Sequence, residues 1–394
     1  MRRTLIALTS AVAAAAGALV SVSPAPAAPA TTVAGRPAQA DRRPIVIAHR
    51  GASGYRPEHT LEAYRLAIAL GADYVEPDLV STRDGVLVAR HENEISGTTD
   101  VAARPEFADR RTTKVIDGTP VGGWFTEDFT LAELKTLRAT ERLPQVRPGN
   151  TAYDGRYQVP TLQEVINLVR VESRRRHRVI GIYPETKHPS YFASIGLPLE
   201  EPLLRTLRRN GLAHRRAPVV IQSFETANLR ALARRTSVRL VQLLDATGRP
   251  YDFVAAGDPR SYADLARPAG LAWIARYADG VGTNKNLLVP RDAAGALLAP
   301  TSVVADAHRA GLVVHAWTVR SENTFLPADF RTGANPAGLG DAAAEYALFY
   351  RLGVDGVFSD HPDAAVAARV AAAGPRSVRV AAGPRSARVV ARRW

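Results

Sequence analysis

The stretch from Ile45 to Glu92 constrains the fold of this chain more than any other, because strand and helix patterns alternate in it without a break. It reads IVIAHRGASGYRPEHTLEAYRLAIALGADYVEPDLVSTRDGVLVARHE. An apolar strand at 45–47 leads into a polar turn, and Thr60 is a candidate N-cap for an amphipathic helix that ends at Gly71. Two more strands follow. This alternation is typical of a parallel α/β sheet.

Polar residues stand where each of these strands ends. His49 and Arg50 follow the first strand, Glu76 and Asp78 lie on the second, and His91 ends the run 86–91. The carboxyl ends of parallel strands meet at one edge, where active sites form. Each residue alone also has an ordinary structural explanation, such as a hydrogen-bonded histidine or a solvated strand face. Their occurrence at three consecutive strand ends favours a functional site.

The two carboxylates at 76 and 78 predict a metal. Residues two apart in a strand point to the same face, and like charges side by side are unfavourable unless a cation joins them. Mg²⁺ and Ca²⁺ are hard cations that take oxygen ligands. A later strand, 179–183, is followed by Glu185, the expected third ligand, and by Lys187, which falls on the same side and could hold a phosphate oxygen. A surface ion pair between these last two is the alternative explanation.

Strand and helix patterns then alternate to residue 359. Further strands are predicted at 219–224, 239–244, 280–282, 312–319 and 356–359, with helices at 162–171, 202–209, 227–235, 301–310 and 342–352. If 86–91 is counted as an extension of the second unit, eight units result, which predicts an α/β fold of the (β/α)₈ TIM barrel type. Residues 93–160 break the alternation. They predict a small inserted cap segment that walls the pocket, with a helix at 131–137 opened by a capping box at Thr130 and Glu133.

Both ends of the chain are predicted to lie outside the barrel domain, which is placed at 44–371. Residues 1–30 have the basic start, alanine-rich apolar segment and small-residue cleavage candidates of a secretory signal peptide, and 31–43 form a linker. We therefore expect a secreted or periplasmic protein. Residues 372–394 hold the tandem repeat AAGPRSVRV and AAGPRSARV, which predicts a disordered basic tail. This tail is either dispensable or weakly associated with anionic envelope polymers.

Composition argues against several functional classes. The chain has no cysteine, so neither disulfides nor thiolate metal sites are available. After the signal, no apolar stretch approaches the roughly 20 residues of a membrane span. The formal charge of +13 would suggest a nucleic-acid partner, but more than half of it comes from arginines at the two ends, which are Arg2, Arg3, Arg376, Arg379, Arg385, Arg388, Arg392 and Arg393. We therefore expect no nucleic-acid partner, and the remaining positive charge would help to attract either anionic substrates or an anionic envelope surface.

Seven motifs together resemble the glycerophosphodiester phosphodiesterase family, and more closely its periplasmic or secreted branch. They are HRGASGYRPEHTLEAY, GADYVEPDLVSTRDGVLVARHE, GIYPETKHP, VIQSF, ADGVG, LVVHAWTVR and GVDGVFSDHPD, and they cover nearly the whole predicted domain. His59 departs from the asparagine of many relatives, although the periplasmic branch is similar in having histidine. The resemblance implies a barrel with an inserted cap, one divalent metal (Ca²⁺ or Mg²⁺), and hydrolysis of glycerophosphodiesters such as glycerophosphocholine and glycerophosphoethanolamine to sn-glycerol 3-phosphate and an alcohol.

The resemblance also implies roles for residues that match the motifs. His49 and His91 would be the acid/base pair, with His49 as base and His91 as acid. Glu76, Asp78 and Glu185 would hold the metal, and Arg50 and Lys187 would bind phosphate. Gln222, Phe224 and Trp317 would line the substrate pocket, with Trp317 on the glycerol side. Aromatic residues in strands are also common in ordinary cores.

Three questions stay open at the level of sequence. The nucleophile is either water or the glycerol 2-hydroxyl, which would form a cyclic phosphate that water then opens. A phospholipase D-like enzyme acting on lysophospholipid or intact lipid is one alternative, and it would need an exposed apolar rim, for which only Trp124 and Phe125 are candidates. A non-catalytic envelope-binding protein, with the barrel as a scaffold for the basic tail, is the other.

Overall fold

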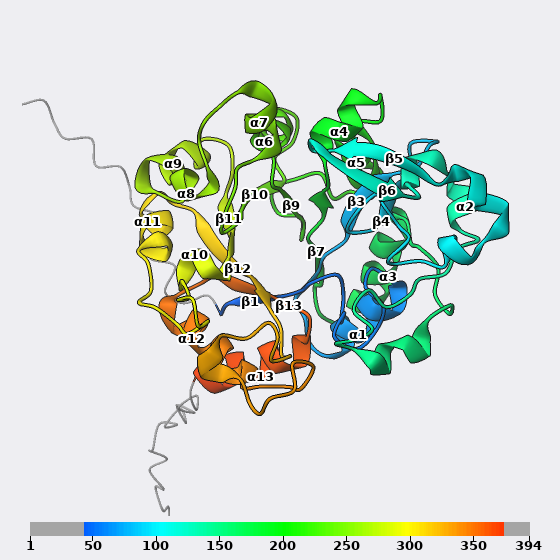
Figure 1. The fold of residues 1–394 in the computed structure, drawn as a ribbon. Coiled ribbons are helices and arrows are strands. Elements are labelled where there is room, and N and C mark those ends of the chain that lie inside the picture. The colour runs from blue at the N-terminus through cyan, green and yellow to red at the C-terminus, as the bar shows by residue number, and fades with distance from the viewer. Residues whose placement is uncertain (1–42, 374–394) are drawn as a thin grey trace, which may run out of the picture. The chain divides into compact units, whose positions relative to one another are not determined.

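A computed structural model of the chain describes residues 43–373, and these form the predicted TIM barrel (Figure 1). The barrel strands are β1 (Ile45–Ala48), β2 (Tyr74–Val75) continued by β3 (Asp78–Ser81), β7 (Gly181–Ile182) continued by β8 (Glu185–Thr186), β9 (Val220–Ser223), β10 (Arg239–Leu244), β11 (Gly280–Asn284), β12 (Val313–Val319) and β13 (Gly356–Ser359). Neighbours pair in parallel in this order, and β13 pairs with β1, so the sheet closes. The predicted signal peptide, linker and repeat tail lie outside the described residues, except for the few that border the domain.

Two barrel strands are interrupted by proline beside the predicted metal ligands. Pro77 separates β2 from β3, and Pro184 separates β7 from β8. Proline has no amide hydrogen, so it leaves a gap in the hydrogen-bond ladder, but its carbonyl still accepts. Glu185 N donates to Pro77 O over 3.1 Å and Gln222 N donates to Pro184 O over 2.9 Å, so the strands stay in register across the gap. Glu76 and Glu185, the carboxylates beside these prolines, are therefore held in position by hydrogen bonds on both sides of each gap.

The strand before His91 was predicted to extend the second unit of the barrel, but it does not lie in the parallel barrel wall. β4 (Leu87–Ala89) runs antiparallel to β3, with Leu79 opposite Ala89 and Ser81 opposite Leu87. The chain therefore leaves the barrel along β3, turns, and returns along β4, so that Arg90 N donates to Asp78 O over 2.9 Å. His91 reaches the mouth of the barrel because a hairpin brings it back, whereas Glu76 and Asp78 are there because parallel strands end there.

Helices form the layer outside the barrel (Figure 1). Their first turns follow the capping rules: Thr60 accepts from Ala63 N at the start of α1, and Thr161 with Glu164 forms a complete capping box at the start of α3. The helices are α1 (Leu61–Ala69), α3 (Leu162–Arg175), α4 (Pro189–Ser194), α5 (Glu200–Arg209), α6 (Thr226–Ala233), α7 (Tyr251–Ala256), α8 (Tyr262–Leu265), α9 (Pro268–Ile274), α10 (Lys285–Leu288), α11 (Val303–Arg309), α12 (Ala342–Leu352) and α13 (Pro362–Ala372). No helix within residues 43–373 is long and apolar enough to cross a membrane.

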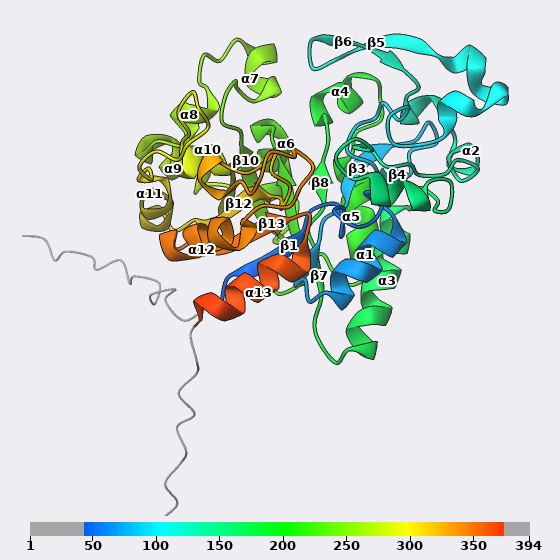
Figure 2. The same ribbon diagram turned by 60° about the horizontal axis from the view of Figure 1, so that its bottom comes forward.

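Residues 93–160 contain the hairpin of β5 (Thr112–Ile116) and β6 (Thr119–Gly123), the short helix α2 (Leu131–Leu134) and several 3₁₀ turns (Figure 2). The capping box of Thr130 and Glu133 is present as predicted, but the α-helix ends at 134 rather than 137. Trp124 and Phe125, the candidates for an exposed apolar rim, are buried, and Trp124 Nε1 donates to Phe107 O over 2.6 Å. The segment thus uses its aromatic residues to join the main hydrophobic core.

Candidate active site

A cavity of about 320 Å³ opens at the end of the barrel where the predicted site residues lie. Eight of the ten predicted residues line it: His49, Arg50, Glu76, His91, Glu185, Gln222, Phe224 and Trp317. Asp78 is buried beside Glu76, and Lys187 lines a neighbouring hollow. Segments 284–291 and 317–325 supply the rest of the wall together with Leu243 and Phe358. No residue of 93–160 lines this cavity, so the prediction that this segment walls it is wrong for the main pocket.

Three buried carboxylates lie together beside the cavity, and two of them, Glu76 and Glu185, line it. One ligand oxygen from each of Glu76, Asp78 and Glu185 lies within 4.8 Å of the others. Burial, then the charges of Asp78 and Glu185, raise the pKa of Glu76 well above its usual value, and burial raises the pKa of Glu185 to about 7 although Lys187 opposes this. Asp78 Oδ1 is buried without a hydrogen-bond partner. An orphaned oxygen within a mutually repelling carboxylate set fits a hard divalent cation.

The carboxylate of Asp78 is hydrogen-bonded to the buried side chain of His59. His59 Nε2 lies 3.0 Å from Asp78 Oδ2, and its Nδ1 lies 2.8 Å from the hydroxyl of Tyr64 in α1. Burial alone would raise the pKa of Asp78, but His59 and Arg50 together hold it below the usual value. His59 and Arg50 both have positive φ, 55° and 61°, which non-glycine residues adopt only where surrounding contacts require it. His59 therefore orients a predicted metal ligand, and such partners commonly tune metal affinity.

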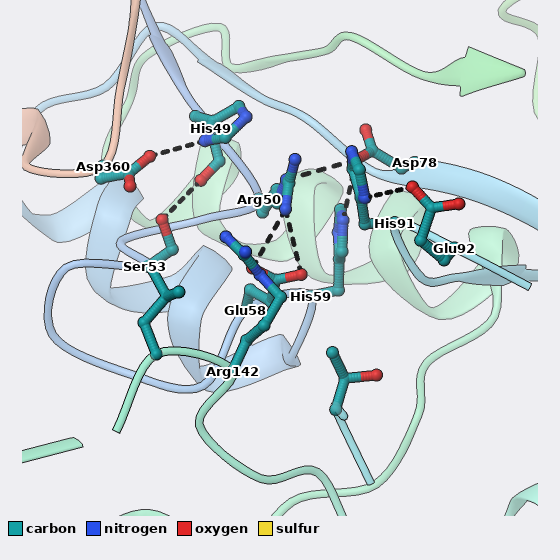
Figure 3. Close-up of polar contacts among 12 residues, drawn as sticks. His49, Arg50, Ser53, Glu58, His59, Asp78, His91, Glu92, Arg142 and Asp360 are labelled. Atoms are coloured by element: carbon teal, nitrogen blue, oxygen red, sulfur yellow. Dashed lines mark hydrogen bonds and ion pairs between the residues drawn. The ribbon is translucent and has the colours of Figure 1, made fainter. Parts of the chain in front are cut away.

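His49 is paired with a carboxylate that the sequence analysis did not select (Figure 3). Its Nδ1 lies 2.5 Å from Oδ1 of Asp360, the residue after β13. A carboxylate only accepts hydrogen bonds, so Nδ1 carries the hydrogen and Nε2 keeps a free lone pair. Burial and the nearby Arg50 lower the pKa of His49 to about 4 despite the charge of Asp360. His49 is thus neutral at neutral pH and able to accept a proton at Nε2.

Asp360 keeps its charge because two arginines contact its other oxygen. Arg147 Nη2 lies 2.5 Å and Arg320 Nε lies 2.8 Å from Asp360 Oδ2. Arg147 also donates to Ser53 O over 3.0 Å and to Glu322 Oε1 over 2.6 Å. Arg147 belongs to segment 93–160. The segment therefore contributes to the site by supporting the partner of His49.

His91 and Lys187 form the opposite side of the site. Lys187 Nζ lies 3.1 Å from Glu185 Oε1 and donates to His91 Nε2 over 3.3 Å, while His91 Nδ1 lies 2.7 Å from Glu92 Oε1. Burial and the charges of Arg50 and Lys187 lower the pKa of His91 to about 3. Burial would lower the pKa of Lys187, but Glu185 and Glu92 raise it above its ordinary value. In this arrangement His91 is neutral and Lys187 is charged.

The three predicted pocket residues have different surroundings. Gln222 donates from Nε2 to Glu76 Oε1 over 2.6 Å, so it orients a carboxylate as well as lining the cavity. The rings of Phe224 and Trp317 meet edge to face with centroids 5.6 Å apart. Trp317 Nε1 donates to Gly282 O over 2.9 Å, which fixes the plane of the indole. Both aromatic side chains remain partly exposed to the cavity, unlike ordinary core residues.

The model of the glycerophosphoryl diester phosphodiesterase family matches residues 49–364. This chain belongs to that family. A glycerophosphodiester phosphodiesterase of Arabidopsis thaliana is 36% identical over 332 residues, which are 81% of this chain and 84% of the relative. A glycerophosphodiester phosphodiesterase of Haemophilus influenzae is 31% identical over 343 residues, covering 82% and 88% of the two chains.

Solved structures of the family share the fold at low identity. A family member from Silicibacter pomeroyi superposes with a TM-score of 0.58 at 21% identity, covering 84% of this chain and 94% of that one. A phosphodiesterase of Oleispira antarctica, determined in complex with the product sn-glycerol-3-phosphate, gives a TM-score of 0.54 at 20% identity, covering 82% and 96%. These likenesses support the barrel prediction.

Asp360, Arg147 and Arg320 of this glycerophosphoryl diester phosphodiesterase family member were not predicted as site residues, and His59 stood out only as a departure from the asparagine of many relatives. Asp360 directly follows β13, so the strand-end rule that selected His49 and Glu185 could also have selected it. Nothing in the sequence pairs it with His49, because the two residues are 311 positions apart. Arg147 lies in an irregular loop, and no pattern there marks it as a buried cation.

Replacing Arg147 with alanine should strongly destabilise the fold. The substitution leaves the buried carboxylates of Asp360 and Glu322 without this partner, and breaking a buried ion pair in this way costs about 3–5 kcal/mol. The free energy of unfolding in urea measures the loss. Arg142→Ala is the matched control, because Arg142 is a third exposed and its partner Glu58 also contacts Arg50; it should cost about 1 kcal/mol or less. Equal losses in both variants would contradict a special role for Arg147.

Proposed function

We propose that this chain hydrolyses glycerophosphodiesters to sn-glycerol 3-phosphate and an alcohol, with a divalent metal held by Glu76, Asp78 and Glu185. The observation that carries the proposal is one cavity lined by two neutral histidines, Arg50 and two buried carboxylates. Asp78 is buried beside these carboxylates, and Lys187 contacts His91 from a neighbouring hollow. The names of the relatives in Arabidopsis and Haemophilus support the reaction type. The product named for the Oleispira complex supports the glycerol phosphate half of the substrate.

Ca²⁺ or Mg²⁺ is the proposed cofactor, because the ligand set consists of oxygens only and the described residues include no cysteine. When bound, such a cation stabilises the negative charge that develops on the phosphoryl oxygens. Gln222 and His59 would keep two of the ligand carboxylates in place. Arg50 and Lys187 would bind the phosphodiester anion from two sides and stabilise the same developing charge.

The proton transfers are assigned to the two histidines. His49 Nε2 would accept a proton from the nucleophile, which is water or the glycerol 2-hydroxyl, while Asp360 stabilises the resulting imidazolium. His91 would deliver a proton to the departing alkoxide. It is neutral in the free protein, so the charge of the bound phosphodiester would have to offset Arg50 and Lys187 and raise its pKa.

The pH dependence of kcat, measured at saturating substrate so that the bound diester keeps His91 protonated, should reflect the lowered pKa of His49. His49 acts in its neutral form, so this requirement is met above its pKa and fails as pH falls through it; the acid limb is expected well below the ordinary histidine value of 6.5. Asp360→Asn removes a charge that raises this pKa, so the limb should move to lower pH. Rates measured between pH 3.5 and 8, with return to pH 7 to check that inactivation is reversible, test this. A limb between pH 6 and 7 contradicts the assignment.

Release of glycerol 3-phosphate from glycerophosphocholine and from intact phosphatidylcholine, with and without a chelator, tests the proposed function directly. We expect chelator-sensitive hydrolysis of the water-soluble diester alone. The phospholipase alternative is weakened because Trp124 and Phe125, its candidate rim, are buried. Hydrolysis of intact lipid would nevertheless favour it, and no hydrolysis of either compound would favour an envelope-binding protein.

We also propose export across the cytoplasmic membrane and weak association of the tail with anionic envelope polymers. The support is the signal-like pattern of residues 1–30 and the basic repeat of 372–394. Both proposals rest on the sequence. Fractionation of cells expressing the full chain and a chain that ends at residue 373 tests them together.

A further inference from the structure

A second hollow of about 250 Å³ lies directly beside the main cavity. The two share Glu185 and Phe224 as a common wall, and Lys187 lines the second hollow while it contacts His91 of the first. A phosphodiester held between Arg50 and Lys187 therefore has space on two sides. One of these spaces is the part of the main cavity that Trp317 lines, and the other is the second hollow.

Aromatic rings line the route between these two spaces. The ring of Phe224 lies edge to face with Trp317 on the one side and with Tyr262 on the other, with centroids 5.6 and 6.0 Å apart. Tyr262 is buried within the wall of the second hollow, and Tyr251 of α7 also lines it. Lys187 Nζ lies 5.7 Å from the centre of the Phe224 ring, so a cation already sits against this wall. Aromatic faces of this kind attract ammonium groups.

Negative charge surrounds this aromatic wall. Glu225 lines the hollow, and Asp245 and Asp252 lie close enough to Tyr262 that burial and then these carboxylates raise the pKa of its phenol above the usual range. None of the three acids forms a salt bridge within residues 43–373, and Asp252 Oδ1 is buried without a hydrogen-bond partner. Burial, with Asp117 and Asp252 contributing, raises the pKa of Glu225 to about 7, as expected where no nearby cation offsets the charge.

The cationic side chains that line the hollow are either paired with an acid or exposed to solvent. Lys187 is paired with Glu185, and His188 lies 2.6 Å from Asp117 and 2.7 Å from Glu92. Arg249 also lines the hollow but is exposed to solvent, and it donates to Asp258 O over 3.4 Å. Within residues 43–373 no cation forms an ion pair with Glu225 or lies over the ring of Tyr262, so an ammonium group beside them would not have to displace one.

We propose that this second hollow binds the leaving alcohol and selects alcohols that carry an ammonium group, such as choline and ethanolamine. This inference rests on the proposed function, because it places glycerol on the Trp317 side and the head group on the Tyr262 side of one phosphodiester. His91 lies at the junction, 3.3 Å from Lys187, where the departing oxygen would need a proton. Head-group preference is thus assigned to Phe224, Tyr262 and the acids around them.

Steady-state kinetics with two diesters tests this assignment. Glycerophosphocholine has a cationic head group, whereas glycerophosphoglycerol has a neutral one of similar size. Tyr262→Leu should raise KM for glycerophosphocholine about tenfold and change KM for glycerophosphoglycerol less than twofold. Tyr262→Phe keeps the ring and should behave like wild type. Glu225→Gln should raise KM for glycerophosphocholine several-fold and again spare the neutral diester.

Direct binding of choline separates this inference from the proposed function. Calorimetric titration of the metal-loaded full chain with choline should show binding that Tyr262→Leu loses and Tyr262→Phe keeps. Choline binding of this kind supports the subsite even if no diester is turned over, in which case the proposed function alone fails. If diesters are hydrolysed but choline does not bind, or if Tyr262→Leu affects both diesters equally, the subsite is overturned while the proposed function stands.

Discussion

His49→Ala should lower kcat for glycerophosphocholine by about three orders of magnitude, within the range of 10²–10⁴ that a positioned general base contributes. His49 Nε2 faces the cavity with a free lone pair, while Nδ1 is held by Asp360. Alanine removes the proposed proton acceptor but leaves the proposed metal ligands, Arg50 and Lys187 in place. KM should therefore change little, so that kcat and kcat/KM fall together.

A second histidine–aspartate pair provides the control for this substitution. His308 Nε2 lies 2.9 Å from Asp355 Oδ2 on the outside of the barrel, remote from the cavity lining. His308→Ala removes the same type of pair and should leave kcat unchanged. Circular dichroism and the melting temperature show whether each variant is folded. Turnover of folded His49→Ala within tenfold of wild type would exclude His49 as the base.

The barrel and the cluster of Glu76, Asp78 and Glu185 were predictable because the periodicity of each strand and helix shows where the strands end, and those ends meet at one edge of the sheet. Glu76 and Asp78 share a face by the two-residue repeat of a strand, and Glu185 follows a strand that the topology places next to them. The prediction for His91 was also right about position, but for a different reason, since β4 is the returning arm of a hairpin. Closeness in sequence explains the position of His91, because Arg90 returns beside Asp78 once the turn at 82–86 forms.

The support of His49 could not be predicted, because it depends on pairings between distant residues. Asp360 meets His49 across 311 positions and Arg147 across 213, and neither contact follows from any local pattern. Segment 93–160 was expected to wall the substrate pocket, yet it supplies no residue to the main cavity and only Asp117 to the second hollow. Its aromatic residues pack into the core, and its Arg147 pairs with Asp360. An irregular segment has no repeating pattern of polar and apolar residues, so its sequence does not show which side chains are buried. Their burial is known only from the three-dimensional structure.

Glu76→Gln should have opposite effects on activity and on the stability of the metal-free protein. It removes a ligand, so turnover should fall about a thousandfold, as expected for loss of several kcal/mol of charge stabilisation by a metal. It also removes one of three mutually repelling charges. Burial, Asp78 and Glu185 raise the pKa of Glu76, so its ionised form destabilises the fold, and this cost grows as pH rises above the unfolded-state value near 4.5. The metal-free variant should therefore melt at a higher temperature than metal-free wild type, by more at pH 8 than at pH 5.

Calcium or magnesium titrations decide whether the carboxylate set is the metal site. Binding to the folded state alone raises the melting temperature by mass action, so wild type should be stabilised on titration and Glu76→Gln should respond far less. Glu141→Gln is the matched control, because Glu141 is also a buried acid whose pKa burial raises, but its contacts are with Asn150 and Leu143. This control should keep the full response to the metal. If Glu76→Gln responded as strongly as Glu141→Gln, the cation would have to bind elsewhere.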